Sequence, residues 1–233
     1  MAWRLKTSII SLIGAPGSGK GTYGSMLASR IQNSTFLSVG DILREQSELK
    51  ETLRSGSLVD DSFVNEAIMQ QLKQISNQAA SAKSVVLLDG FPRNEAQASL
   101  LSKWPSELQN IQALHFSVPD DICITKLLGR RKCIICKGSF NVNDVDANGF
   151  YMPPLLPADG SCPVQCNMDT DWQKRDDDTE GTIRARMEVY HKQTKPVLKY
   201  WSELGKLHTF VPYNGVEDID EMIITVDKML RNV

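Results

Sequence analysis

The stretch IISLIGAPGSGKGTYGSM, residues 9–26, decides the fold of this chain. Its apolar start is typical of a buried strand, and a glycine-rich turn then leads into a segment that can form a helix. Backbone N–H groups of such a turn and the N-terminus of the helix converge on one point, which attracts an anion. The pattern G-x-x-x-x-G-K, from Gly14 to Lys20, therefore predicts a phosphate-binding loop in an α/β protein.

The loop residues have separate predicted tasks. Gly17 and Gly19 let the backbone approach phosphate oxygens, and Lys20 adds a cation that can follow charge onto a transferring phosphoryl group. Gly21 stands where a Ser or Thr usually binds magnesium, so we expect Thr22 to take that role. The alternative is an ordinary glycine-rich turn, but Lys20 and the preceding strand-like run argue against it. This pattern predicts a nucleotide site and leaves the reaction open.

Length and composition limit the class of protein. The 233 residues suffice for one α/β domain with an insertion, with 41% hydrophobic and 23% charged residues. We expect no membrane contact, since no apolar run approaches the roughly 20 residues needed to cross a bilayer. A formal charge of −2 argues against general nucleic-acid binding. The first residues, MAWRLKTSII, leave no room for a signal segment before the strand, so we expect a cytoplasmic protein. We also expect a monomer.

Five strand-like runs alternate with helix-like segments. They cover residues 8–13, 35–39, 84–88, 113–118 and 207–211. This alternation predicts an α/β fold with a doubly wound, parallel five-stranded sheet and helices on both faces. Ligands of such sheets bind beyond the carboxyl ends of the strands. The residues that follow each strand are therefore candidates for the site.

The second strand is followed by SVGDILR, residues 38–44. Gly40 is expected to break the strand, and Asp41 to cap a helix that continues to about residue 54. Arg44 lies one turn into this helix, where it can face the phosphate loop. A solvated position on the helix surface is the alternative for Arg44 taken alone.

The third strand ends in LLDGFPR, residues 87–93. A carboxylate at the end of a buried strand is costly unless it meets a cation, so we expect Asp89 to face magnesium and the phosphate loop. The alternative is a structural Asp that caps Gly90. Pro92 stiffens the turn and presents Arg93.

A helix is predicted over residues 119–131, and helical periodicity is then lost from 132 to 172, where Gly and Pro recur. A stretch this long without regular structure is either disordered or a functional insertion. Arginines stand at both of its ends, at Arg130, Arg131 and Arg175, and favour a lid over a phosphate site. Farther on, an apolar stripe predicts a helix from residue 182, on which Arg186 rather than Arg184 should face the site.

Six motifs in this order resemble the adenylate kinases. They are GAPGSGKGT at 14–22, GDILR at 40–44, DGFPR at 89–93, GRR at 129–131, R-x-D-D at 175–178 and R-x-x-x-Y-x-x-x-T-x-P at 186–196. The resemblance spans almost the whole chain. It implies reversible phosphoryl transfer from Mg-ATP to AMP, giving two ADP, by a core domain at 1–37, 68–130 and 178–233, a monophosphate-binding segment at 38–67 and a lid at 131–177.

The resemblance also implies the roles of individual residues. The transferring group would be surrounded by the catalytic side chains of Lys20, Arg93, Arg130, Arg175 and Arg186. ATP would be bound by Gly17, Ser18, Gly19, Lys20, Gly21, Thr22 and Arg130. AMP would be bound by Val39, Arg44, Gly90, Arg93, Gln97, Arg175 and Arg186, and Asp89 would hold magnesium through water. The lid would exclude water, which otherwise takes the phosphoryl group.

The choice of bases depends on a few positions. Gln97 matches a family glutamine whose amide binds adenine, and solvated helix surface is its alternative. Three positions depart from the family pattern. Val39 replaces a Thr that is frequent in the family, and the segment between Arg44 and residue 56 is shorter than in many relatives. Lys126 replaces an arginine that commonly stacks on the donor base, and a lysine stacks less well. Another pairing, GTP with AMP or ATP with UMP or CMP, therefore remains open. So does a module that binds adenylates without turnover.

Four of the five cysteines fall in the insertion, as Cys133-x-x-Cys136 and Cys162-x-x-x-Cys166. Such spacings fit a structural zinc site, and some adenylate kinases have a four-ligand zinc lid here. The three-residue gap of the second pair leaves reduced thiols as the alternative. A bound zinc would fold a lid that is poor in apolar residues.

Overall fold

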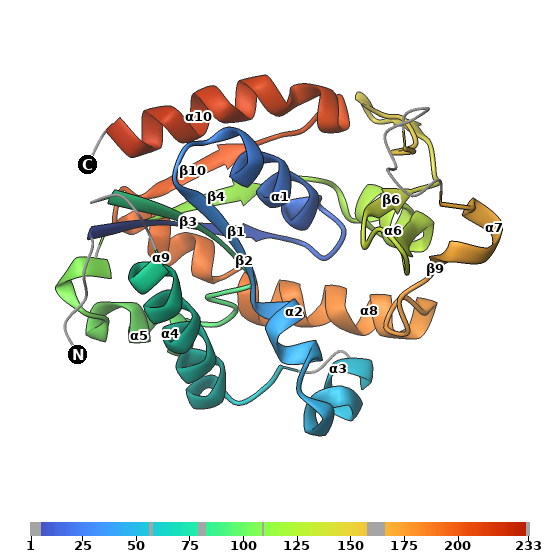
Figure 1. The fold of residues 1–233 in the computed structure, drawn as a ribbon. Coiled ribbons are helices and arrows are strands. Elements are labelled where there is room, and N and C mark those ends of the chain that lie inside the picture. The colour runs from blue at the N-terminus through green and yellow to red at the C-terminus, as the bar shows by residue number, and fades with distance from the viewer. Residues whose placement is uncertain (1–5, 56–57, 79–82, 109, 158–165, 232–233) are drawn as a thin grey trace.

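A parallel five-stranded sheet forms the centre of the computed structural model, which describes residues 6–55, 58–78, 83–108, 110–157 and 166–231 (Figure 1). The strands follow the order β10-β4-β1-β3-β2. They are β1 (Lys6–Gly14), β2 (Ser34–Ser38), β3 (Lys83–Asp89), β4 (Ile111–Phe116) and β10 (Leu207–Phe210). Each coincides with a predicted strand to within a few residues, and the predicted fold class is confirmed.

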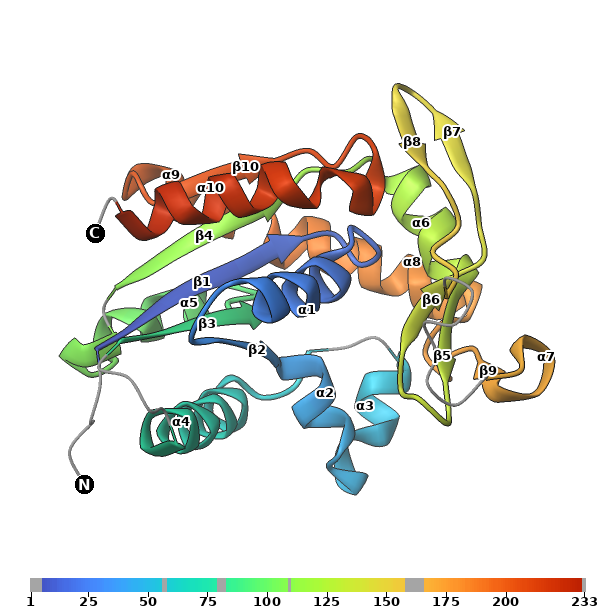
Figure 2. The same ribbon diagram turned by 45° about the horizontal axis from the view of Figure 1, so that its top comes forward.

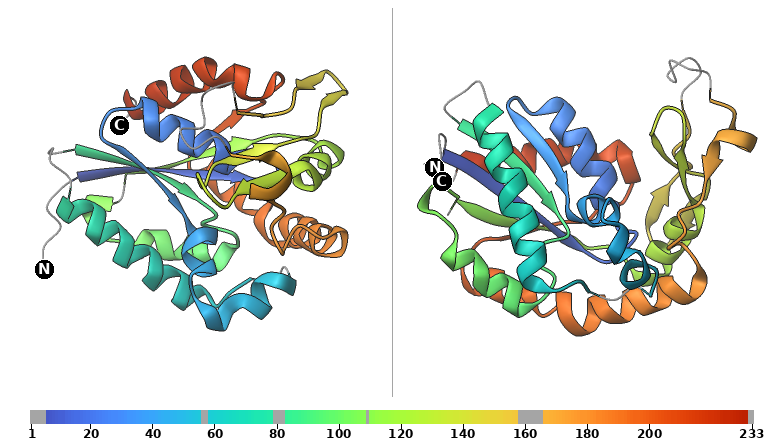
Figure 3. Two further views of the ribbon diagram at one scale, coloured as in Figure 1. Left: turned by 45° about the vertical axis from the view of Figure 1, so that its right-hand side comes forward. Right: turned by 60° about the horizontal axis from the view of Figure 1, so that its bottom comes forward.

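Helices cover both faces of this sheet (Figures 1 and 3). One face carries α1 (Lys20–Arg30) and α10 (Ile219–Arg231), and the other carries α4 (Asp61–Gln78), α5 (Glu95–Leu100) and α9 (Val197–Glu203). Successive side chains of a strand point to opposite faces, so Ile9 and Ile13 of β1 pack toward α4 and α9, whereas Ile10 and Leu12 pack toward α1 and α10. The continuous apolar run of β1 is explained by burial on both sides.

The predicted helix from an Asp41 cap to residue 54 is wrong. Instead, α2 (Val39–Arg44) is followed by the 3-10 helix η1 (Ser47–Leu49) and by α3 (Lys50–Ser55). The Ser38 side chain caps α2 by accepting the N–H of Asp41, 3.2 Å away, while the Asp41 carboxylate binds Arg44. Tight three-residue hydrogen bonds, Gln46 N–H to Leu43 O and Leu49 N–H to Gln46 O, interrupt the helix.

The predicted helix over 119–131 ends early, and the insertion contains strands. The helix α6 (Asp120–Gly129) stops where Gly129 approaches Asn141, since a Cβ there would lie 2.5 Å from the Asn141 Oδ1. Two small sheets then follow. Their strands are β5 (Arg130–Cys133), β6 (Ser139–Asn141) and β9 (Trp172–Gln173) in one, and β7 (Val145–Ala147) and β8 (Phe150–Met152) in the other. The short helix α7 (Met168–Asp171) precedes β9.

The β7–β8 hairpin, residues 145–152, packs against α6 (Figure 2). Phe150 and Met152 lie in one buried apolar cluster with Ile122 of α6. The Phe150 ring is 5.1 Å from the ring of Tyr213, and the N–H of Tyr151 donates to the Tyr213 carbonyl over 2.7 Å. This part of the insertion is therefore attached to the loop after β10 as well as to α6.

The apolar stripe that predicted a helix from residue 182 is buried in the core. It runs through α8 (Glu180–Val189), a π-helical turn at Tyr190–Thr194 and α9. Its buried members are Ile183, Met187, Tyr190, Thr194, Val197 and Trp201. The remaining short helices are η2 (Leu101–Lys103), η3 (Ser106–Leu108) and η5 (Gly215–Asp218). Within the described ranges, no helix has the length and apolar character required to cross a bilayer.

Candidate active site

A cavity of about 470 Å³ lies beyond the carboxyl ends of the central strands. Its walls come from the phosphate loop, α2, the end of β3, α6, the insertion and α8. This volume lies within the roughly 300–1,000 Å³ typical of small-molecule sites. The cavity is therefore where the topology of a parallel sheet predicts a ligand.

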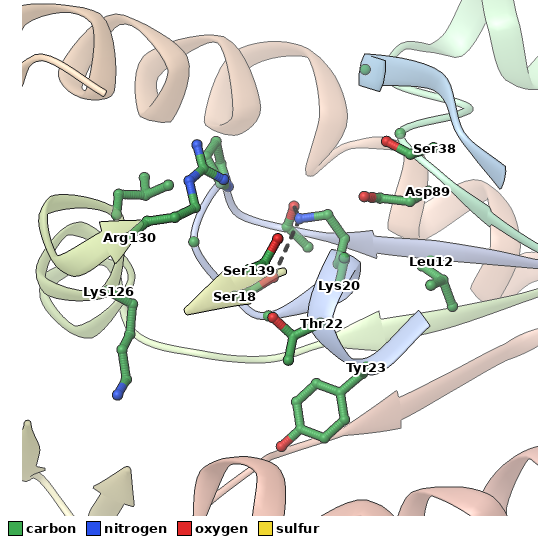
Figure 4. Close-up of a pocket in the computed structure, with 18 of the residues that line it drawn as sticks. Leu12, Ser18, Lys20, Thr22, Tyr23, Ser38, Asp89, Lys126, Arg130 and Ser139 are labelled. Atoms are coloured by element: carbon green, nitrogen blue, oxygen red, sulfur yellow. Dashed lines mark hydrogen bonds between the residues drawn. The ribbon is translucent and has the colours of Figure 1, made fainter. Parts of the chain in front are cut away.

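The phosphate loop has the backbone shape that its glycines allow. Gly17 and Gly19 have φ values of +90° and +92°, in the left-handed region that favours glycine. The Lys20 ammonium donates to the carbonyls of Gly14 and Ala15, at 2.9 and 2.8 Å. It also donates to the Ser18 hydroxyl over 3.3 Å (Figure 4). Burial lowers the pKa of Lys20 to about 8, although Asp89 acts to raise it. The side chain is thus predominantly protonated at neutral pH.

Asp89 and Thr22 line the cavity near Lys20 (Figure 4). Asp89 is the last residue of β3 and contributes a favourable charge interaction to Lys20. A Cβ on residue 21 would lie 3.9 Å from the Asp89 Oδ2, so the carboxylate lies beside the first turn of α1. A carboxylate and a hydroxyl are the oxygen donors that Mg²⁺ prefers. The donor set at this position therefore fits magnesium.

Five arginines from separate elements line the same cavity, namely Arg44, Arg93, Arg130, Arg175 and Arg186. Burial is the main cause that lowers the pKa of Arg175 and Arg186, to about 10 in each case, and neighbouring guanidinium groups lower both further. A pKa of about 10 leaves both of these guanidinium groups cationic at neutral pH. Sequence analysis predicted this set, and the structure brings its members together.

Aspartates pair with most of these arginines. Arg130 forms a bidentate pair with Asp178, with distances of 2.7 and 2.6 Å, and Arg186 lies 3.1 Å from Asp177. Arg44 binds Asp41 at 2.6 Å. By contrast, Arg184 pairs with Glu180 on the exposed side of α8, and Arg186 alone of the two lines the cavity, as the helical periodicity predicted.

Three ion pairs join the α2–α3 segment to residues 175–178. The distances between charged atoms are 4.0 Å for Arg44–Asp177, 3.8 Å for Arg175–Asp41 and 3.6 Å for Arg54–Asp176. Asp41 and Arg44 of α2 line the main cavity, and so does Arg175. Sequence analysis missed these pairs because nothing in the local pattern aligns positions that are more than 100 residues apart.

A second cavity, of about 20 Å³, lies beside the first. Val39, Leu43 and Leu58 line it together with Gln97 and Arg93. The Gln97 side chain is only 2% exposed; its Oε1 accepts the N–H of Arg93 and its Nε2 donates to Asp61, both at 2.7 Å. The space admits about one or two waters. A purine can enter it only if the surrounding apolar side chains move apart.

The opposite end of the main cavity is built around Lys126 (Figure 4). Its ammonium donates to the carbonyls of Met152 and Asn143, at 2.7 and 3.1 Å. The Tyr23 hydroxyl donates to the Gly215 carbonyl nearby. Sequence analysis marked Lys126 only as the replacement of an arginine that stacks on the donor base, and it missed Met152 and Tyr23, which no motif indicates. In this structure the Lys126 charge holds the β7–β8 hairpin against α6.

Three cysteine sulfurs of the insertion converge. The sulfurs of Cys133, Cys136 and Cys166 lie within 4.8 Å of one another, while Cys162 lies outside the described residues. The Cys133 sulfur accepts backbone N–H groups from Ile135 and Cys136, at 3.3 and 3.4 Å. Burial alone raises the pKa of the Cys133 thiol. These two bonds, together with hydrogen bonds to the Cys166 and Cys136 side chains, outweigh burial, and the pKa is lowered. Converging sulfurs with backbone donors fit a tetrahedral zinc site.

Comparison with known proteins gives consistent matches along the chain. Residues 12–206 match the family model described as adenylate kinase. An adenylate kinase of Caldicellulosiruptor bescii is 39% identical over 229 residues, which cover 94% of this chain and 97% of that protein. The GTP:AMP phosphotransferase of Plasmodium falciparum is 36% identical over 222 residues, 91% of this chain and 93% of that protein. A probable chloroplastic adenylate kinase 6 of Arabidopsis thaliana is 34% identical, over 88% of this chain and 70% of its own.

Proposed function

The chain belongs to the adenylate kinase family of phosphotransferases, and we propose that it transfers the terminal phosphoryl group of Mg-ATP to AMP, giving two ADP. The observation that supports this most is the group of five guanidiniums and one ammonium around a single cavity at the phosphate loop. GTP is the second candidate donor, since one relative is named a GTP:AMP phosphotransferase. Binding of adenylates without turnover is disfavoured because a sensor needs fewer cations.

The proposed chemistry requires charge neutralisation rather than a general base. The attacking phosphate oxygen of AMP is already an anion, so the obstacles are negative charge on the transferring group and competition from water. In this proposal Lys20, Arg130 and Arg186 stabilise the transferring group, with Arg93 and Arg175. Arg44 and Arg93 hold the phosphate of AMP. Thr22 and Asp89 are the residues that would hold magnesium, which when bound neutralises the phosphates of the triphosphate.

Exclusion of water is assigned to the insertion. We propose that residues 131–177 act as a lid and residues 38–67 as a monophosphate-binding segment that close on the substrates. The ion pairs between residues 175–178 and α2–α3 support contact between the two segments. The proposal includes a monomer in the cytoplasm, which sedimentation and cell fractionation test. Support for the location comes from the cysteine cluster, since metal-binding thiols are typical of reducing compartments.

A coupled assay tests the reaction. The purified protein with ATP, AMP and magnesium is expected to form ADP. Lys20→Met should reduce the rate by at least about 10³-fold, because the negative charge of the transferring phosphoryl group is no longer stabilised by the ammonium. A panel of ATP and GTP as donors with AMP, UMP and CMP as acceptors then identifies the pairing. Bound nucleotide with no ADP above the Lys20→Met background would contradict the proposed function.

We also propose that Cys133, Cys136, Cys162 and Cys166 hold a structural zinc ion. Purified protein is expected to carry about one zinc per chain, and Cys133→Ser should lose the metal and make the insertion sensitive to protease, because metal binding supplies most of its folding energy. Elemental analysis and limited proteolysis measure the two effects. Cys123→Ala, which alters a buried cysteine in α6, is the control and should keep the zinc. The site would be refuted if the protein as purified contains no metal and its insertion nevertheless resists the protease.

A further inference from the structure

We propose that Asp61 is a positioning residue that fixes the side-chain amide of Gln97, so that the acceptor site selects a 6-aminopurine over a 6-oxopurine. The inference rests on the proposed function, in which AMP is the acceptor. Asp61 is the first residue of α4, and Gln97 lies on α5, which packs beside α4 (Figure 1). The two residues are 36 positions apart in the sequence.

The partners of the Gln97 amide determine its orientation. The backbone N–H of Arg93 can only donate, so it must meet the amide oxygen, which lies 2.7 Å away. The Asp61 carboxylate, when ionised, can only accept, so it must meet the amide nitrogen, also 2.7 Å away. If the amide were rotated by half a turn, both contacts would be lost. The amide nitrogen would then face the N–H of Arg93, and the amide oxygen would face the Asp61 carboxylate. Because Gln97 is buried, water does not replace the lost bonds.

Asp61 is itself held in place. The Asn94 Nδ2 donates to both carboxylate oxygens of Asp61, at 3.0 and 3.3 Å. The Asn94 Oδ1 in turn accepts the N–H of Gln97 at 2.7 Å and caps α5. The carboxylate, the cap and the amide thus form a closed network. The orientation of the amide is set before any base arrives.

Gln97 also lines the small cavity. Its contacts with Arg93 and Asp61 leave one N–H of Nε2 and one lone pair of Oε1 with which the amide can bind a base. Adenine presents an acceptor at N1 and a donor at its 6-amino group, whereas hypoxanthine presents a donor at N1 and an acceptor at O6. A glutamine that can rotate satisfies either edge, but an amide fixed by Asp61 satisfies one. With AMP as acceptor, that edge is adenine, and IMP is rejected.

The test compares AMP with IMP as acceptors, because these nucleotides differ only in the groups at N1 and C6. Asp61→Asn can both donate and accept, so it removes the constraint on Gln97 while keeping the shape of the side chain. We expect the ratio of kcat/KM for AMP to that for IMP to fall by about tenfold, mainly through KM, which corresponds to about 1.4 kcal/mol. Asp61→Ser, whose hydroxyl also donates and accepts, should lower the ratio similarly and serves if Asp61→Asn does not fold.

Asp60→Asn is the matched control. Asp60 precedes α4 and its Oδ1 accepts the N–H groups of Ser62 and Phe63, a cap that asparagine preserves. The substitution removes the same charge next to the same helix without touching Gln97, so the AMP-to-IMP ratio should remain that of the unmodified protein. An Asp61→Asn ratio equal to the control would overturn the inference, even if both rates fall together. That outcome differs from failure of the proposed function, in which the unmodified protein makes no ADP from AMP.

Discussion

Replacing Arg186 by alanine is expected to lower kcat by about 10³-fold or more, because an arginine aimed at a transferring phosphoryl group contributes about 10³–10⁵ in rate. The side chain comes from α8, lines the main cavity and is 19% exposed. Its guanidinium lies 3.1 Å from Asp177 and 3.7 Å from Asp178, and these carboxylates hold it in place. Steady-state kinetics with both substrates measure the loss, and thermal unfolding shows that the fold is retained.

Arg184→Ala is the matched control for this prediction. Arg184 stands two positions earlier in the same helix, is 71% exposed and pairs with Glu180 one turn away. Such exposed pairs contribute about 0.3–0.5 kcal/mol, so kcat should change by less than about twofold. Arg186→Lys keeps the charge but loses the planar guanidinium, so its kcat should lie between those of Arg184→Ala and Arg186→Ala. Equal rates for the Arg184 and Arg186 variants would remove Arg186 from the catalytic set.

Replacing Gly17 by alanine is expected to destabilise the protein by about 2–5 kcal/mol and to abolish triphosphate binding. Left-handed strain contributes about 1–2 kcal/mol and overpacking about 1–3 kcal/mol. Gly17 has a φ of +90°, and a Cβ there would lie 2.2 Å from the Cys123 carbonyl oxygen and 2.9 Å from a Leu127 side-chain carbon. Backbone of α6 cannot move away without disturbing the core. The loop must move instead, which displaces the N–H groups predicted to bind phosphate. Denaturant unfolding and nucleotide titration measure the two effects.

Gly181→Ala is the control for backbone strain. Gly181 lies in the first turn of α8, where no atom approaches within 4 Å of the added Cβ and φ is not left-handed. Alanine should therefore be neutral or stabilise the protein by up to about 1 kcal/mol, since it favours the helix and restricts the unfolded chain. A Gly17→Ala protein as stable and as active as Gly181→Ala would contradict the close packing of the loop against α6.

The sequence was sufficient to predict the parts of the fold that repeat a pattern. The apolar run of β1 and the stripe from Ile183 to Trp201 indicate which residues are buried. The sheet and the long C-terminal helical segment could therefore be predicted. The break between α2 and α3 could not, because Glu45 and Gln46 are good helix formers and tertiary hydrogen bonding overrides their propensity. Strands of three residues in the insertion are too short for any period to be visible.

The cationic residues of the site could be predicted because motifs mark them, whereas the carboxylates that pair with them could not. Arg130 and Arg186 follow recognisable patterns, but the bidentate contact of Arg130 with Asp178 depends on how β5 and the segment before α8 meet in space. The same holds for the contact of Asp61 with Gln97. Gln97 was chosen for its amide, yet the group that orients the amide lies on another helix. Pairwise contacts of this kind arise from packing and leave no local signature.

The three ion pairs between α2–α3 and residues 175–178 link the proposed closure of the site to ionic strength. They include well exposed groups, with 60% and 83% of the Arg54 and Asp176 side chains accessible. Dissolved salt screens such charges over about 8–10 Å at physiological concentration. If the two segments close on the substrates as proposed, added salt favours their separation, which would speed product release and would also let water reach the phosphates.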